Sequence, residues 1–295
     1  MKKTIFTGSC VAIVTPMQED GSIHYDRLGA MLEEQIAAHT DAVCICGTTG
    51  ESATMSDEEH IEAIRYTVKK VAGRIPVIAG AGSNHTDYAV FLSKEAKAAG
   101  ADALLQVTPY YNKTSQQGLI DHFYAIADAT DLPLILYNVP SRTGVAIKPE
   151  TYAQLAKHPN IVAAKEACGD ISAIAETFRL CGDQLDIYSG NDDQIVPILA
   201  LGGKGVISVL ANVQPRTAHD ICQLFFDGKV REAAQLQLDS LPLIHALFME
   251  VNPIPVKEAL NLMGKQAGPL RKPLAPLSEA QRQVLRSALE AAHLL

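Results

Sequence analysis

The stretch PVIAGAGSNHTDYAVFLSKEAKAAGADALLQV, residues 76–107, contains one complete strand–helix–strand unit. An apolar run, 76–79, begins it, and a second apolar run, 103–107, ends it. Between the runs, Thr86 can cap a helix that extends to Ala99, and Gly100 is a typical helix stop. A crossover helix of this kind is the usual connection between two parallel strands.

The same unit recurs along the chain. Its apolar runs are continuous rather than alternating, which is typical of parallel strands covered on both faces. Eight such runs are present: 10–14, 43–46, 76–79, 103–107, 134–137, 161–164, 185–188 and 206–209. Helical patterns separate most of them: 57–70, 86–99, 115–129, 149–157, 172–181 and 192–201. The first of these helices would begin at a capping box, Ser56-Asp-Glu-Glu59.

Eight alternations of strand and helix predict an α/β fold, the (β/α)8 TIM barrel. A doubly wound open sheet is the alternative. None of the apolar runs is followed by G-x-G-x-x-G, which weakens the dinucleotide-binding version of that alternative.

The chain changes character after residue 209. The rest has no convincing strand and four helical patterns: 218–226, 230–249, 254–263 and 279–293. Ser278-x-x-Gln281 is a second capping box, and the proline-containing segment 270–276 indicates a linker. We therefore predict two domains, a barrel over residues 1–216 that carries the active site and a helical C-terminal domain over residues 217–295. The second domain is also a candidate oligomer surface.

The composition is that of an ordinary globular protein, with 47% apolar and 20% charged residues among 295. The formal net charge of −8 argues against nucleic-acid binding, which needs a basic face. No run of about 18 apolar residues is present, so no membrane span is predicted. Two N-terminal lysines resemble the start of a signal peptide, but Gly8 and Pro16 interrupt the apolar stretch behind them. We expect a cytoplasmic protein that binds neither nucleic acid nor membrane.

The cysteines do not form a recognisable metal or redox motif. None of the six belongs to a C-x-x-C, and a zinc site would need further ligands at fitting spacing. We expect them to be buried as small apolar side chains in a reducing compartment, and we expect neither a metal nor an organic cofactor.

The active site of a TIM barrel lies at the carboxyl ends of the strands, and Lys165 is the principal candidate there. It follows Ile161-Val-Ala-Ala164 and shares a strand face with Ala163. A lysine inside the barrel must pair its charge or lose it. Burial lowers a lysine pKa from its usual value of about 10.4, and a neutral amine can attack a keto acid. The alternative is an ion pair with Glu166, which is awkward because neighbours on a strand point to opposite faces.

Lys257, in Asn252-Pro-Ile-Pro-Val-Lys257, is the rival lysine. It follows no predicted strand. We therefore expect it to be a surface or scaffold residue.

Schiff-base chemistry also needs groups that transfer protons. Tyr137 ends the run next to that of Lys165, and Tyr110 and Tyr111 follow the run 103–107. A tyrosine with its usual pKa of about 10 is a proton donor at neutral pH, and a relay through Thr48 could carry the proton. The alternative for each tyrosine is a half-buried position at the barrel rim.

Two further segments suit carboxylate groups. Arg142, in a Pro-Ser-Arg-Thr-Gly loop, carries a planar guanidinium group, although a solvated loop arginine is the alternative. Gly47-Thr-Thr-Gly50 offers backbone N–H groups and two hydroxyls, enough to hold the carboxylate of a keto acid. A phosphate cradle is the alternative there, but no Walker lysine follows.

In this order, the motifs resemble the dihydrodipicolinate synthase (4-hydroxy-tetrahydrodipicolinate synthase) family. It belongs to the superfamily of N-acetylneuraminate lyase and 2-keto-3-deoxy sugar-acid aldolases. The resemblance runs nearly end to end, and the Arg142 loop and the paired Thr48 and Thr49 resemble the synthase branch. Its main motifs are Gly47-Thr-Thr-Gly-Glu51, Tyr137-Asn-Val-Pro-Ser-Arg-Thr-Gly144, Lys165-Glu-Ala167 and Asn252-Pro-Ile-Pro-Val-Lys257.

The resemblance implies condensation of pyruvate with L-aspartate 4-semialdehyde, a step of lysine and diaminopimelate biosynthesis. Lys165 would form a Schiff base with pyruvate. Tyr137, Thr48 and Tyr111 would relay protons, with Tyr111 reaching in from a neighbouring subunit. The family is usually homotetrameric, as a dimer of dimers.

The resemblance also implies how the substrates are held. Thr49 would bind the pyruvate carboxylate, and Arg142 the carboxylate of the semialdehyde. Gly190 and Ile207 would give backbone contacts near the pyruvate.

A lysine effector site at a dimer interface is implied as well. Where lysine-sensitive members have a carboxylate, this chain has Tyr88, and Asp57 stands at a nearby histidine position. Asp57 either replaces the lost charge or leaves the site weak, and we expect reduced sensitivity to lysine. The positions that match the family's site are Ser52, Ala53, His60, Asn84 and Tyr110.

Two rival functions stay open at this point. One is a related pyruvate-dependent aldolase or lyase with the same imine chemistry, against which Arg142 argues, because a small anionic aldehyde needs it and a sugar chain does not. The other is a non-catalytic keto-acid-binding protein. The intact set of Lys165, Tyr137, Thr48 and Arg142 argues against it.

Overall fold

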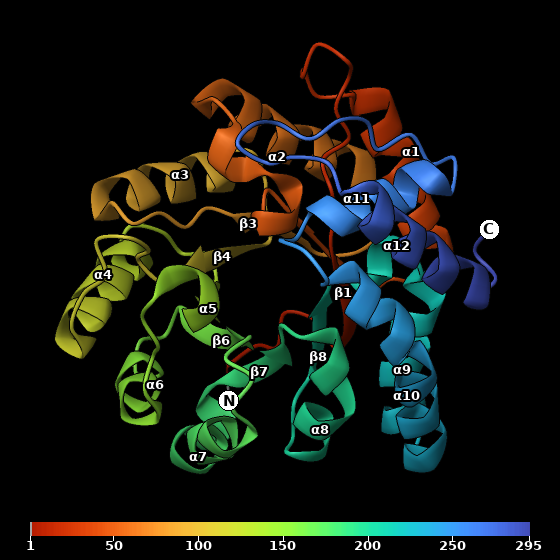
Figure 1. The fold of residues 1–295 in the computed structure, drawn as a ribbon. Helices are drawn as coiled ribbons and strands as arrows, with labels where there is room; N and C mark the ends of the chain where they lie inside the picture. The colour runs from red at the N-terminus through yellow and green to blue at the C-terminus, as the bar shows by residue number, and fades with distance from the viewer. Residues whose placement is uncertain (1) are drawn as a thin grey trace.

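The computed structural model describes residues 2–295, and its strands close into a barrel (Figure 1). All neighbouring strands are parallel and follow the sequence order, and the last pairs with the first. The TIM barrel predicted from the sequence is confirmed, and each strand begins and ends within two residues of its predicted run. The strands are β1 (Gly8–Ala12), β2 (Ala42–Ile45), β3 (Val77–Gly80), β4 (Ala103–Val107), β5 (Leu134–Asn138), β6 (Ile161–Glu166), β7 (Asp186–Ser189) and β8 (Gly205–Ser208).

The helices form a ring outside the strands, and the C-terminal helices gather on one side of it (Figure 1). The α-helices are α1 (Tyr25–Ala37), α2 (Asp57–Val71), α3 (Thr86–Ala98), α4 (Gln116–Asp128), α5 (Pro140–Thr143), α6 (Pro149–Leu155), α7 (Ile171–Cys181), α8 (Ile195–Ala200), α9 (Pro215–Phe226), α10 (Val230–Leu247), α11 (Ile254–Leu262) and α12 (Glu279–Ala291). The short 3-10 turns are η1 (Thr48–Gly50), η2 (Ser52–Thr54), η3 (Gly182–Gln184), η4 (Asp192–Gln194) and η5 (Leu210–Asn212).

The N-terminal ends of the helices show which residues cap them. Both predicted capping boxes are confirmed, at Ser56 and at Ser278. The prediction that Thr86 caps α3 is wrong: the cap position is His85, and the Thr86 hydroxyl lies 3.0 Å from Nδ1 of His122 on α4. Helix α1 and the single turn of α5 were not predicted.

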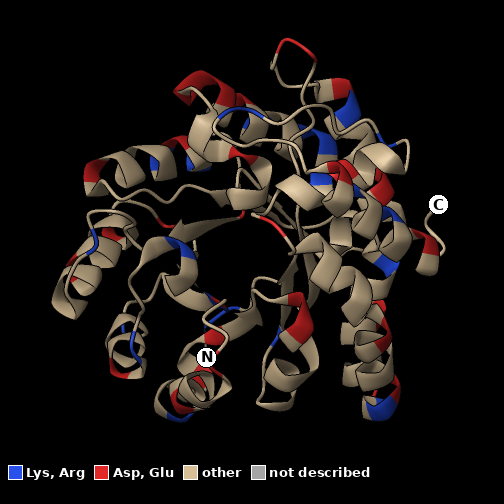
Figure 2. Ribbon diagram, in the orientation of Figure 1, with Lys and Arg blue, Asp and Glu red and all other residues tan. Residues whose placement is uncertain are grey.

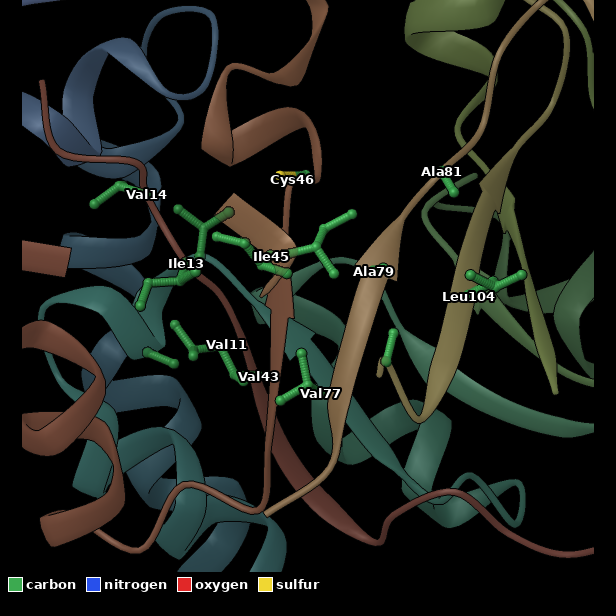
Figure 3. Packing of buried hydrophobic residues seen from close by; sticks show 14 of the residues in the cluster. Val11, Ile13, Val14, Val43, Ile45, Cys46, Val77, Ala79, Ala81 and Leu104 are labelled. Carbon is green, nitrogen blue, oxygen red and sulfur yellow. The ribbon is translucent and has the colours of Figure 1, made fainter. Parts of the chain in front are cut away.

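Alternation along the strands separates two cores. One set of side chains, including Val11, Ile13, Val43 and Ile45, packs outward against the helices (Figure 3). The other set fills the barrel interior: Cys10, Ala12, Ala42, Cys44, Ile78, Ala103, Leu105, Ile135, Tyr137, Ala163, Tyr188 and Ile207. Both faces of each strand are therefore buried, which explains the continuous apolar runs.

Charged side chains lie mainly on the outer helices and loops, with both signs interspersed (Figure 2). The cysteines are free thiols, and all except the half-buried Cys168 are buried. No helix within residues 2–295 is long and apolar enough to span a bilayer.

The C-terminal helices continue directly from the barrel. Helix α9 packs against β1 and β8, and α10 packs against α9 and α12. The division into domains at residue 216 stays a prediction, and its first residue, Met1, lies outside the described residues.

Two glycines, Gly8 and Gly205, lie where β1 meets β8. Gly8 has a φ of 116°, and a Cβ there would lie 2.1 Å from Oδ2 of Asp41. Gly205 has a φ of 150°, and its Cβ would lie 1.8 Å from the carbonyl oxygen of Gly8. The second contact is with backbone, so a side chain at residue 205 forces the two strands apart.

We expect Gly205→Ala to lower the free energy of unfolding by about 3 kcal/mol or more, because the clash and the unfavourable φ act together. Gly73→Ala is the matched control, since Gly73 has a φ of 72° but nothing within 4 Å of the added Cβ. The control should lose only about 1 kcal/mol. Chemical unfolding followed by circular dichroism measures both, and equal losses would contradict the packing argument.

Candidate active site

Lys165 lies near the carboxyl end of β6 and points into the barrel. Its side chain is buried, and its Nζ lies 4.3 Å from the ring centroid of Tyr137. The strand register pairs Tyr137 on β5 directly with Lys165 on β6. The two residues therefore share one inward face, and the ring can stabilise a cationic nitrogen above it.

A cavity of about 480 Å³ opens above Lys165. It brings together six of the residues proposed from the sequence: Lys165, Tyr137, Thr48, Thr49, Arg142 and Gly190. Part of its wall comes from residues 248–252, which follow α10.

Two of the proposed residues are placed differently. Ile207 is fully buried on β8 and is not among the residues that line the cavity. Tyr111 is 92% exposed, has a φ of 67° and also does not line the cavity. Within this subunit, Tyr111 is therefore separate from the other candidates.

The turn that the sequence predicts to bind a carboxylate is η1, which follows β2 after Cys46 and Gly47. Thr49 in this turn is buried, and its Oγ1 accepts a hydrogen bond of 2.9 Å from Nδ2 of Asn252. A hydroxyl has a single proton to donate. Because Thr49 accepts from Asn252, its own proton stays available for an oxygen in the cavity.

Arg142 is fixed by the same asparagine. It lies on the short helix α5, and its Nη2 donates a 3.0 Å hydrogen bond to the carbonyl oxygen of Asn252. Asn252 thus contacts both proposed carboxylate-binding residues. We did not single it out from the sequence, although it begins the Asn252-Pro-Ile-Pro-Val-Lys257 motif, because that segment follows no strand.

Glu166 occupies the opposite face of β6 from Lys165. Its Oε1 accepts a 2.6 Å hydrogen bond from the Tyr152 hydroxyl, and Asn138 donates to both carboxylate oxygens at 3.1 Å. Burial raises the pKa of Glu166, and the Tyr152 hydrogen bond partly opposes that rise. The alternative of a Lys165–Glu166 ion pair is therefore wrong, since the carboxylate is engaged on the outer face.

Two further buried groups lie on the Lys165 side of the barrel. Oδ2 of Asp192 accepts from the backbone N–H groups of Val209 and Leu210, at 3.0 and 2.9 Å. Burial raises the pKa of Asp192, and the positive charge of Lys165 is among the smaller effects that lower it. Cys44 lines the cavity, and burial raises the pKa of its thiol to about 11. This thiol is therefore protonated at neutral pH.

The chain matches known proteins over nearly all of its length. Residues 5–292 match the model of the dihydrodipicolinate synthetase family. The chain belongs to this family. The 4-hydroxy-tetrahydrodipicolinate synthase of Caldicellulosiruptor bescii is 56% identical over 286 residues, which cover 97% of either chain.

Solved structures agree with this assignment. The chloride-inhibited dihydrodipicolinate synthase of Acinetobacter baumannii, complexed with pyruvate, is 44% identical with a TM-score of 0.97, and the match covers 99% of this chain and 100% of the other. DHDPS from Cyanidioschyzon merolae with lysine bound is 41% identical with a TM-score of 0.96 and the same coverage. The family resemblance and the predicted activity, a lyase of the 4-hydroxy-tetrahydrodipicolinate synthase type, are confirmed.

The environment of Glu166 predicts a pH-dependent stability. The pKa of Glu166 is higher in the folded than in the unfolded protein, so protonation of Glu166 stabilises the fold. This contribution to the free energy of unfolding is fully present below pH 4.5, the usual pKa, and is lost as the pH rises through the folded pKa. Tyr152→Phe removes a donor to the ionised form. We expect it to destabilise the fold by about 1–3 kcal/mol at neutral pH and by less in acid.

Tyr124→Phe is the matched control. The Tyr124 hydroxyl donates 2.8 Å to the carbonyl oxygen of Gln154, which does not titrate. Its stability loss should not depend on pH. Thermal unfolding of both variants between mildly acidic and neutral pH makes the comparison, and parallel pH curves for the two would refute the assigned role of Tyr152.

Proposed function

We propose that this protein condenses pyruvate with L-aspartate 4-semialdehyde through a Schiff base on Lys165, in lysine and diaminopimelate biosynthesis. The arrangement of the cavity carries the proposal. Lys165 lies in an otherwise apolar barrel below a cavity whose wall contains two separate groups that suit carboxylates, Thr49 and Arg142. Each substrate has one carboxylate, and pyruvate also has the ketone that an amine attacks. The pyruvate complex of the similar Acinetobacter baumannii enzyme supports this choice.

The proposed reaction begins at the amine of Lys165. The neutral amine adds to the keto carbon of pyruvate, and water leaves to give the imine. Loss of a methyl proton gives an enamine, whose carbon attacks the aldehyde of the second substrate. The amino group of that substrate then adds to the imine carbon, closes the ring and displaces Lys165.

Tyr137 and Thr48 are the proposed proton-transfer groups within this subunit. Both line the cavity, and Tyr137 is next to Lys165 in register. Gly190 and the backbone of Ile207 are proposed to contact the pyruvate. Tyr111 completes the relay only from a second subunit, because it is exposed in its own. We propose that the protein is cytoplasmic and assembles as a homo-oligomer, a tetramer built as a dimer of dimers.

Borohydride trapping tests the Schiff base. With pyruvate present, reduction should attach a pyruvate-derived group to the peptide that contains Lys165, as detected by mass spectrometry. Lys165→Ala should remove the adduct and lower kcat by at least about a thousandfold, the scale of losing a covalent nucleophile. An adduct on Lys257, or none at all, would refute the mechanism. Ring formation after addition of aspartate semialdehyde separates the synthase from the related aldolases.

We also propose an effector pocket with altered chemistry. A second cavity, of about 580 Å³, is lined by Ser52, Ala53, His60, Tyr88 and Tyr110. Asn84 does not line it but donates a 3.0 Å hydrogen bond to the carbonyl oxygen of Tyr110.

Two ionisable side chains near this cavity, Asp57 and His60, already have close polar partners. The hydroxyl of Tyr88 donates to Oδ1 of Asp57, and His60 lies 2.7 Å from the carbonyl oxygen of Gly80. Burial lowers the pKa of His60. A lysine ligand would therefore meet Asp57, whose carboxylate already accepts a hydrogen bond from Tyr88, and a neutral His60.

We expect weak lysine binding for this reason. Isothermal titration of the protein with lysine should give no resolved heat of binding below millimolar concentrations. Tyr88→Glu restores a carboxylate where lysine-sensitive family members have one, and it should tighten binding by about tenfold or more, as one added ion pair in a partly buried site allows. Tight binding by the unaltered protein would refute the expectation.

A further inference from the structure

The buried ion pair between Lys257 and Glu51 is not used by the proposed mechanism. Lys257 lies on α11, and its Nζ is 2.7 Å from Oε1 of Glu51; both side chains are 1% exposed. The expectation of a surface lysine is therefore wrong, while a scaffold role stays open. Lys257 does not line the cavity above Lys165, so it is not placed to react with a substrate there.

Both charges of the pair have further close partners. Lys257 also donates to the carbonyl oxygen of Pro269 at 2.6 Å, and the second oxygen of Glu51 accepts from the backbone N–H of Arg271 at 2.9 Å. The Arg271 guanidinium in turn binds Glu59 of α2 and the carbonyl oxygen of Thr54. Two residues of the C-terminal segment, Lys257 and Arg271, therefore each bind one carboxylate oxygen of Glu51.

Glu51 is the residue that ends the carboxylate-binding turn. It follows η1 directly, with a φ of 58° and a ψ of 31°, and its N–H donates to the carbonyl oxygen of Thr48 at 3.1 Å. A non-glycine residue in this left-handed conformation is unfavourable by itself and persists only where its surroundings hold it. The hydrogen bonds from Lys257 and Arg271 to the Glu51 carboxylate supply that constraint.

We propose that Lys257 and Glu51 are a positioning pair, which sets the Thr48–Thr49 turn at the spacing that the pyruvate carboxylate requires. This inference rests on the proposed function. Glu51 is two residues from Thr49, so a shift of its backbone moves both threonine hydroxyls. Asn252, in the same C-terminal segment, donates a hydrogen bond to Thr49 and so also holds the turn in place.

A purely stabilising ion pair and a positioning pair predict different kinetics. Loss of a purely stabilising ion pair lowers only the stability of the fold, whereas loss of a positioning pair also weakens binding of the substrate that the turn holds. Arg142, which is proposed to hold the second substrate, is on α5 and does not belong to this turn. Loss of the pair should therefore raise KM for pyruvate more than KM for aspartate semialdehyde.

The test compares Lys257→Met with a matched control, Lys265→Met. Lys265 lies in the same C-terminal segment and pairs with Glu34 of α1, but it contacts neither the turn nor the cavity. We expect Lys257→Met to raise KM for pyruvate by about tenfold or more, with KM for the semialdehyde changed less than about threefold, since small displacements of a binding group have effects of this size. Borohydride trapping on Lys165 should need correspondingly more pyruvate. Lys265→Met should leave both KM values unchanged.

A second variant guards against misfolding. Lys257→Met leaves Glu51 as an uncompensated buried charge, which is strongly unfavourable, whereas Glu51→Gln combined with Lys257→Met leaves no buried charge. The double variant should fold and still show a raised KM for pyruvate, by about threefold or more. An unchanged pyruvate KM in either folded variant, or an equal rise in Lys265→Met, would overturn the positioning role. Failure of the unaltered protein to form the Lys165 adduct would instead overturn the proposed function, and this inference with it.

Discussion

The contact between β1 and β8 is the constraint on which the site depends. At Gly205 the two strands leave no room for a side chain, because a Cβ there would meet the backbone of Gly8, and the pairing of β1 with β8 closes the ring of strands. In a closed ring of parallel strands, all carboxyl ends face the same way. Thr48, Tyr137 and Lys165 are far apart in the sequence, yet they line one cavity because they lie at or just beyond the carboxyl ends of β2, β5 and β6.

Strand alternation then gives two neighbouring ionisable residues opposite surroundings. Lys165 points inward against the Tyr137 ring, and Glu166 points outward to Tyr152 and Asn138. The outward carboxylate is fully occupied by neutral donors, so it does not compete for the amine. The two-residue period of the strand therefore keeps the Glu166 carboxylate away from the Lys165 amine.

Much of the fold was predictable because each strand is apolar on both faces, which leaves a simple pattern in the sequence. Helix α1 was missed because its cap is His24 rather than a typical capping residue and because it contains Gly29. Thr86 was misassigned because a hydroxyl can bond to a neighbouring helix instead of its own. The gathered site residues were predictable from the rule that strand ends meet. Asn252 and Lys257 were not, because tertiary packing alone brings them to the turn.

The C-terminal segment therefore belongs to the site even though it follows the barrel in sequence. Asn252 contacts Thr49 and Arg142, and Lys257 holds Glu51, so the turn between β2 and α2 is fixed from outside the barrel. Glu51 also joins this turn to η2, whose residues line the second cavity. The two cavities share part of their walls: Gly47, Thr48, Leu105, Tyr137, Val139, Arg142, Val251 and Asn252. A ligand in one cavity can influence the other by favouring one position of this common wall, and a firmly held Glu51 opposes such a shift.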